Sequence, residues 1–261
     1  TRNMGTAMPI EFRFFAAPDD PEARIARVIA GPPELPSPQG APQRTPGDTG
    51  EEHLGFFRLV TSDTGTHLWQ PGIDSNDPDE AWTQAKPAPE RLIEGNVLRL
   101  ERRGDEPAWV KFRSIPGGEH VHDVAFFDGA LWAVGSGSDH RGEWESGRIF
   151  RYLWRSEDGG ATFTTAHRVM YPDLSKGDTR FRQLLPIGDT LHVFGYVNPF
   201  VDGGPLEGRH VTVRGGVIRD LEGPFARQVV DRAWPLSATL GLLVTREAEG
   251  TPSRAFAVDP R

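Results

Sequence analysis

Apolar residues along the chain come in short runs separated by polar turns, which is the pattern of β-strands rather than of helices. Three pairs of runs share one design: an apolar run, a turn rich in Asp and Gly, and a second run that reads L-[WH]-x-x-G. The second runs begin at Leu68, Leu131 and Leu191, at spacings of 63 and 60 residues. A fourth, degraded copy lies at 234–236 and 240–245. Repeats of this length built from short strands are typical of β-propellers, whose blades are four-stranded antiparallel sheets.

The repeat predicts an all-β, single-domain chain over 1–261, a β-propeller of about five blades within a range of four to six. The last blade is expected to lack its outer strand. We expect the segment 10–15 to close the ring by pairing there, because closure removes exposed strand edges. The Pro/Gly-rich stretch 31–50 is expected to be a surface loop. The predicted strands are 55–60, 67–70, 96–102 and 109–114 in the first blade, 121–127, 131–136, 148–154 and 163–170 in the second, 181–187, 191–197, 209–214 and near 225–230 in the third, and 240–245 and 253–258 in the last.

The turn within the second blade carries the most specific motif, S-x-D-x-G-x-T-F at 156–163. Side chains of Ser and Asp can bond backbone N–H groups two residues on, and glycine accepts the positive φ of a tight reversal. The motif resembles the Asp-box (BNR repeat) of sialidase-like β-propellers, and the alternative is a chance turn in another β-protein. The equivalent turns, placed at 103–107 and 219–224, lack it. The motif residues are Ser156, Asp158, Gly160, Thr162 and Phe163.

The resemblance implies a fold more firmly than an activity, because the superfamily includes sialidases, some endoglucanases and noncatalytic scaffold propellers. Its members are most often exported, so the implied location is secreted or periplasmic. We accordingly interpret the start at Thr1 as a mature form whose leader was removed, with a trimmed chain as the alternative.

The net charge, the length of the apolar runs and the cysteine content limit the classes of partner that the chain is expected to bind. The net charge of −8 disfavours binding to nucleic acid or to an anionic membrane. No apolar run approaches the ~20 residues of a membrane span, so no membrane insertion is predicted. The absence of cysteine excludes disulfides and thiolate metal sites. The charge is compatible with a cationic or neutral partner, and the propeller interpretation makes a glycan or a protein the expected partner.

Candidate binding residues cluster in three long predicted loops, 72–95, 137–147 and 198–208, and near strand starts. An indole face can stack on a pyranose while carboxylates accept its hydroxyl protons, which suits sugar binding. The alternative is a solvated loop whose Trp packs back on the blade. The predicted ligand-binding residues are Trp82, Trp144, His140, Arg141, Arg180, Arg182, Asp231 and Arg232.

A metal site is a second interpretation of the His residues. Strand alternation puts His120 and His122 on one side and Asp123 on the other. With a third ligand such as His53 or His140 they would hold a divalent metal. The favoured alternative is that they bond backbone groups at a blade junction. The acidic run 74–79 lacks the Gly and Glu of an EF-hand loop. No cofactor is therefore predicted, and a divalent metal stays as the alternative.

The residues that a sialidase active site needs are not all recognisable in the sequence. Such a site needs three arginines, a Tyr/Glu pair and an Asp, whereas the run 112–116 departs from the F/Y-R-I-P pattern by an inserted Ser. Tyr152, Tyr171 and Tyr196 are the chain's tyrosines, and none pairs convincingly with a Glu at the expected axis. The leading hypothesis is a noncatalytic module that binds a glycan or a protein through its loop-rich face. The alternatives are a carbohydrate-active hydrolase or lyase, and a scaffold subunit of a larger complex.

Overall fold

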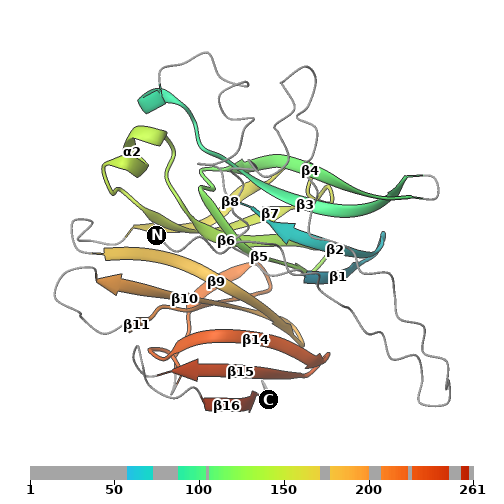
Figure 1. The fold of residues 1–261 in the computed structure, drawn as a ribbon. Coiled ribbons are helices and arrows are strands. Elements are labelled where there is room, and N and C mark those ends of the chain that lie inside the picture. The colour runs from blue at the N-terminus through green and yellow to red at the C-terminus, as the bar shows by residue number, and fades with distance from the viewer. Residues whose placement is uncertain are drawn as a thin grey trace, which may run out of the picture.

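The computed structural model describes residues 58–72, 88–103, 106–170, 177–199, 207–222, 225–246 and 254–258. They form four antiparallel sheets (Figure 1), whose strands follow one another in chain order. No helix among these residues has the length and apolar character needed to cross a bilayer. The first sheet consists of β1 (Arg58–Ser62), β2 (Gly65–Pro71), β3 (Glu94–Arg103) and β4 (Glu106–Pro116), and the second of β5 (His120–Phe127), β6 (Ala130–Gly137), β7 (Phe150–Ser156) and β8 (Thr164–Met170).

The third and fourth sheets complete the described body. The third sheet consists of β9 (Gly177–Ile187), β10 (Thr190–Pro199), β12 (Val211–Arg214) and β13 (Val217–Asp220), and the short β11 (Glu207–Gly208) also pairs with β10. The fourth consists of β14 (Val229–Ser237), β15 (Leu240–Arg246) and β16 (Arg254–Val258). Two single-turn helices, η1 (Ala88–Glu90) and α2 (Arg141–Glu145), precede β3 and β7.

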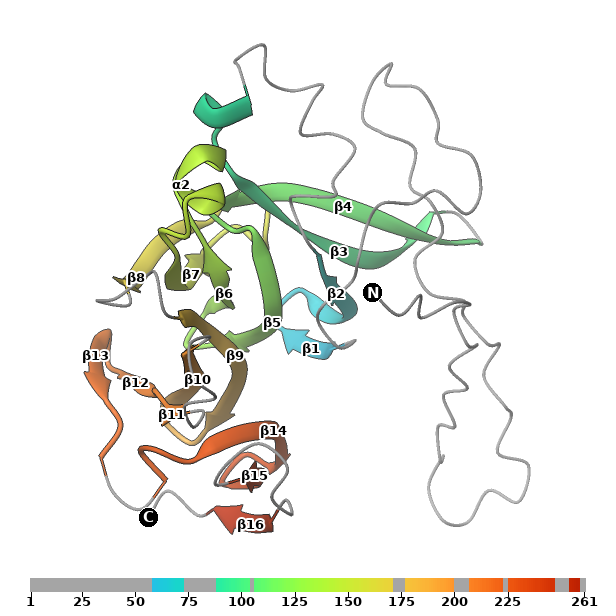
Figure 2. The same cartoon turned by 60° about the vertical axis from the view of Figure 1, so that its left-hand side comes forward.

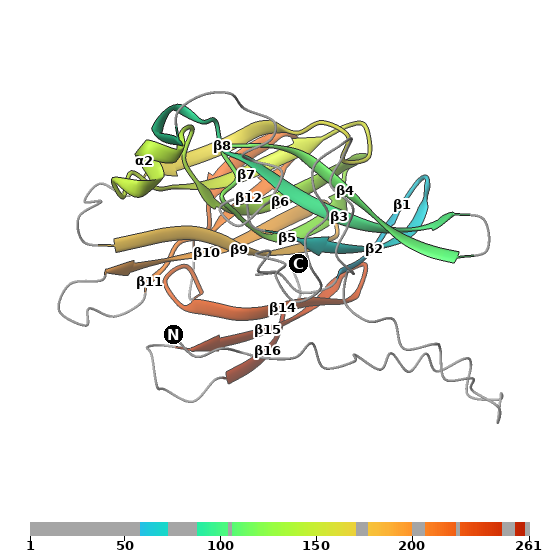
Figure 3. The same ribbon diagram turned by 45° about the horizontal axis from the view of Figure 1, so that its top comes forward.

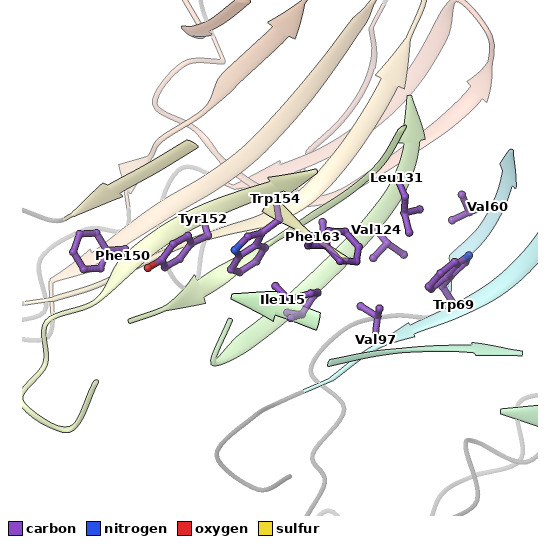
Figure 4. Close-up of a cluster of buried hydrophobic side chains, with 12 residues drawn as sticks. Val60, Trp69, Val97, Ile115, Val124, Leu131, Phe150, Tyr152, Trp154 and Phe163 are labelled. Atoms are coloured by element: carbon purple, nitrogen blue, oxygen red, sulfur yellow. The ribbon is translucent and has the colours of Figure 1, made fainter. Parts of the chain in front are cut away.

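The sheets pack face to face in chain order, as Figures 2 and 3 show. Trp69 of the first sheet and Trp154 of the second share one buried cluster (Figure 4). Leu131 on β6 points into that cluster, whereas its neighbour Trp132 packs against the third sheet. This alternation is the period of two that a strand imposes. Because both faces of the middle sheets are covered, their strands read as nearly continuous apolar runs.

The first strands of the four sheets are joined by a cycle of hydrogen bonds. Arg58 on β1 donates to Asp123 on β5, from Nε at 2.5 Å and from Nη2 at 2.6 Å. Asp123 accepts from the backbone N–H of Leu184 on β9 at 2.7 Å, and the Gln183 side chain accepts from the N–H of Ala233 on β14 at 3.2 Å. The carbonyl of Ala233 in turn accepts from Arg58 at 3.3 Å. The cycle therefore runs through β1, β5, β9 and β14 and returns to β1.

The repeated glycine of the L-[WH]-x-x-G pattern has a packing role. A Cβ on Gly135 would lie 1.8 Å from the carbonyl oxygen of His120, and one on Gly195 would lie 2.5 Å from that of Arg180. Only glycine permits so close an approach of the second strand to the first. The repeat therefore fixes the backbone at the start of β5 and of β9.

The turn between β7 and β8 is held by its own side chains. Asp158 accepts from the backbone N–H of Thr162 at 2.8 Å and from its hydroxyl at 2.5 Å, and the Ser156 hydroxyl donates to Asp158 at 2.8 Å. These hydrogen bonds, those from Thr162 first, lower the pKa of Asp158 to about 2. Gly160 has φ +96°, and the N–H of Phe163 donates to a carbonyl of β4. The turn thus ties the second sheet to the first.

One strand prediction is wrong. The outer strand of the third sheet is β13 at 217–220, not the segment near 225–230, and 229–237 forms β14 instead. The turn before β13 consists of Gly215 and Gly216 with φ +54° and +76°, the geometry of a two-residue hairpin. The turn placed at 219–224 therefore does not join the outer strands of this sheet. The expected closing strand 10–15 and the loop 31–50 lie outside the described residues.

Candidate functional site

Most of the predicted binding residues come together where the first strands begin. The rings of His120 and His122 on β5 have centroids 6.1 Å apart, and the Trp144 ring on α2 meets His120 edge-on at 4.9 Å. The Arg180 and Arg182 side chains on β9 act electrostatically on His122, and Arg182 acts on Arg232 of β14. We call this group the first-strand cluster; its members are His120, His122, Arg141, Trp144, Arg180, Arg182 and Arg232.

A β-bulge shapes the β5 part of the cluster. The β5–β6 register shifts between Val121 and Asp123, so that His122 is the extra residue. Bulges re-aim side chains and are frequent beside functional sites. His122 is consequently 5% exposed and lies within reach of β9, while Asp123 takes part in the hydrogen-bond cycle.

Helix α2 is fixed to the cluster by a buried ion pair. Nη1 of Arg141 donates to Oε2 of the fully buried Glu119 at 2.6 Å. Glu119 directly precedes β5, so this pair sets α2, and Trp144 with it, against the start of that strand. Removing either member of a buried ion pair is strongly destabilising. Arg141 therefore has a structural role in addition to the predicted ligand-binding one.

Two predicted residues take other positions. His140 directly precedes α2 and lines a separate cleft of about 540 Å³ with Glu90, Glu143 and Arg148. Asp231 neighbours Arg232 and raises the pKa of that guanidinium, against the lowering caused by burial and by Arg182. Trp82, His53 and the acidic run 74–79 lie outside the described residues.

Both imidazoles of the cluster are held neutral. Burial, followed by Arg180 and Arg141, lowers the pKa of His120 to about 4. Burial also holds the pKa of His122 well below its ordinary value, and Arg180, His120 and Arg182 act in the same direction. Every charged neighbour that shifts these two pKa values is basic. The potential at the imidazoles therefore favours a negatively charged group.

Three buried polar atoms of this region have no hydrogen-bond partner within the described residues: Nδ1 of His120, Nε2 of His122 and Oγ of Ser136. Ser136 lies directly opposite His120 in the β5–β6 register, so their side chains share one face of the sheet. Native proteins rarely leave such groups unsatisfied, and the usual reasons are a ligand, an ion or an ordered water.

The predicted metal site stays a prediction. Within the described ranges, no group of three or more His, Cys, Asp or Glu side chains is arranged to hold a metal ion. His120 and His122 supply two nitrogens, and the groups around them are cationic. This donor set does not fit a divalent cation, so no step is assigned to one.

Sequence reasoning did not single out Ser136 or Glu119. Ser136 directly follows the repeat glycine of β6, which is a usable signal, since that glycine marks where β6 crosses the start of β5. Glu119 had no such signal, because its partner Arg141 in α2 lies 22 residues away in the sequence.

Comparison with known proteins leaves the family open. No family model matches the sequence, and no curated protein matches it. Among solved structures, it is similar to a protein of unknown function from Dyadobacter fermentans DSM 18053, with 16% identity and a TM-score of 0.46 over 78% of this chain and 60% of that one. It is also similar to Zg3597, a family 117 glycoside hydrolase from the marine bacterium Zobellia galactanivorans, with 10% identity and a TM-score of 0.46 over 84% and 73% of the two chains.

The chain thus spans less than two thirds of the Dyadobacter protein's length. Both likenesses are too distant to assign an activity, and the functional argument rests on the site itself.

Proposed function

We propose that the chain is a β-propeller of the Asp-box type that binds an acidic saccharide at the first-strand cluster without transforming it. Three features support the architecture: the sheets pack in chain order, the first strands share the hydrogen-bond cycle, and the turn at 156–163 has the bonding of an Asp-box. An exported location, secreted or periplasmic, suits such a ligand and is part of the proposal.

The observation that carries the function is the pair of neutral, buried imidazoles with unpartnered nitrogens among basic groups and beside Trp144. A guanidinium donates two parallel hydrogen bonds to a carboxylate. A neutral imidazole can donate to one sugar oxygen or accept from one hydroxyl. An indole offers an apolar surface to a pyranose. A sugar acid presents all three complementary groups.

The same observation favours one second candidate, a lyase acting on an acidic saccharide. A neutral imidazole is a base, and a carboxylate neutralised by guanidinium makes the adjacent carbon–hydrogen bond more acidic. His120 or His122 would accept that proton, a carbon–carbon double bond would form as the glycosidic carbon–oxygen bond breaks, and the departing oxygen would take a proton from solvent water. A scaffold role has no corresponding feature in the cluster.

Binding can be tested with a glycan array that includes uronate, sialoside, sulfated and neutral sugars, followed by calorimetry on the best acidic oligosaccharide. We expect Arg182→Met and Trp144→Ala each to weaken binding about tenfold or more, because each removes a contact worth more than 1.4 kcal/mol. Arg219→Met on β13 is the matched control, since that side chain is exposed and remote.

The outcomes separate the candidates. Binding to acidic sugars with no product formed supports the binding module, whereas an unsaturated product detected by ultraviolet absorbance, and abolished in His120→Gln or His122→Gln, supports the lyase. Equal affinity for neutral and acidic sugars, or full affinity in Arg182→Met, would exclude the first-strand cluster as the acidic-sugar site.

A further inference from the structure

Arg151 on β7 differs from the other buried arginines of the described residues. Arg58 is paired with Asp123, and Arg141 with Glu119. Arg151 is as buried as Arg141, at 8% against 7% exposed, and more buried than Arg58, but among the described residues it has no carboxylate within ion-pair distance. Buried charges in proteins are normally paired, because an unpaired one costs several kcal/mol. Its guanidinium therefore calls for a counter-ion.

The guanidinium has few contacts. Its Nη1 donates to the Thr179 hydroxyl at 3.1 Å, and its Cζ lies 5.4 Å from the ring centroid of Phe181. Its Nε is buried without a partner. An arginine has five N–H donors, so most of the fork is unused. The Thr179 hydroxyl, having accepted from Arg151, can still donate its own proton to a bound group.

The surroundings of Arg151 are basic as well. Burial and then Arg209 lower its pKa to about 10, with Asp220 opposing them. His167, on β8 beside β7, also has its pKa lowered by burial and by Arg151, with Asp220 again acting in the opposite direction. Val169 lies directly opposite Arg151 and His167 lies opposite Leu153, so His167 is the diagonal neighbour of Arg151 on the same face.

We propose that Arg151, Thr179 and His167 form a second ligand site between the second and third sheets, which takes a small oxyanion such as a carboxylate, phosphate or sulfate group. The oxyanion accepts from the unused guanidinium N–H groups and from the Thr179 hydroxyl, and it neutralises the buried charge. The site is distinct from the first-strand cluster: Thr179 and Phe181 flank Arg180 on β9, and alternation directs them to the opposite face of that strand.

Thermal unfolding with low millimolar sulfate, phosphate or acetate tests the site, with chloride at equal ionic strength as the reference. The Arg182→Met background removes a contribution from the first-strand cluster. There we expect a saturable rise of roughly 5 °C in Tm at a hundredfold excess over Kd. The three anions distinguish a carboxylate site from a tetrahedral-oxyanion site.

Arg151→Met in the same background should abolish the saturable rise, and in chloride it should be at least as stable as its parent, because it removes an unpaired buried charge. Arg155→Met is the matched control on β7, since Arg155 is half-exposed and paired with Glu157, and it should keep the rise. Should Arg151→Met fail to fold, Thr179→Val is the second test and should raise the midpoint concentration several-fold.

A saturable rise that persists in Arg151→Met, or that is unchanged in Thr179→Val, would overturn the site. So would the absence of any saturable rise in the Arg182→Met parent. Loss of sugar binding at the first-strand cluster would leave this proposal untouched, so the two can fail separately.

Discussion

The hydrogen-bond cycle among the first strands makes Asp123 a charged residue on which the stability of the described core depends. Asp123 is 2% exposed and accepts four hydrogen bonds, two from Arg58 and one each from the N–H groups of Val124 and Leu184. Asp123→Ala leaves Arg58 buried without its partner, which costs about 3–5 kcal/mol. The orphaned N–H of Leu184 adds to this cost, within about 1–3 kcal/mol. We expect a total loss of about 4 kcal/mol or more.

Urea unfolding of four proteins measures this: the wild type, Asp123→Ala, Arg58→Met/Asp123→Leu and Asp189→Ala. The double variant should regain most of the loss, because an apolar pair replaces a buried ion pair at little cost. Asp189→Ala is the matched control, since its ion pair with Arg214 is exposed to solvent and should contribute little to stability. A loss below 1 kcal/mol in Asp123→Ala, or a double variant as unstable as the single one, would refute the reasoning.

Three other features of the described residues can be tested by stability measurements: the buried histidines, the turn at Asp158 and the close approach at Gly135. Burial holds the pKa of His120 and of His210 at about 4, against 6.5 in the unfolded chain. Between pH 4 and pH 6.5 the unfolded state therefore binds more protons than the folded state. Urea unfolding should show full stability above pH 6.5 and a loss of up to about 3 kcal/mol per histidine as the pH drops to 4. His210→Gln should reduce that slope. Asp158→Ala should cost about 1–2 kcal/mol in urea unfolding, because the backbone N–H and hydroxyl of Thr162 and the hydroxyl of Ser156 lose their common acceptor. Gly135→Ala should cost more than about 2 kcal/mol of stability, because its Cβ would collide with the carbonyl of His120. The displaced His120 should also weaken acidic-sugar binding, and an unchanged affinity in calorimetry would contradict this effect on binding.

The strands that could be predicted are those whose signal is local. The strands of the first two sheets follow the expected ranges to within a few residues, because their apolar runs alternate and their turns carry Asp and Gly. The strand β13 was missed because it is four residues long and mostly exposed, so its apolar pattern is weak. The Gly215–Gly216 turn before it was the stronger signal, since two consecutive glycines between strands indicate a hairpin.

The candidate site was predictable as a list of residues but not as an arrangement. His120, Trp144, Arg180 and Arg232 were chosen for their position near strand starts or in a long loop, and the fold brings them together. The bulge at His122 had no sequence signal, because it depends on the pairing of β5 with β6. The Asp123–Arg58 pair spans 65 residues, and no local pattern connects two such positions.

The hydrogen-bond cycle repeats one contact from sheet to sheet. Asp123 and Gln183 hold equivalent positions, since they pair with Val134 and Phe194, three residues after the leucine of each repeat. Each caps a backbone N–H of the next first strand. Ala233 holds this position on β14, opposite Leu243, and has no acceptor side chain; instead its carbonyl accepts from Arg58 on β1. A side chain of β1 therefore reaches β14 and links the first sheet to the fourth. Arg58→Lys, which shortens the reach and removes the fork, should therefore weaken the fourth sheet selectively in hydrogen exchange.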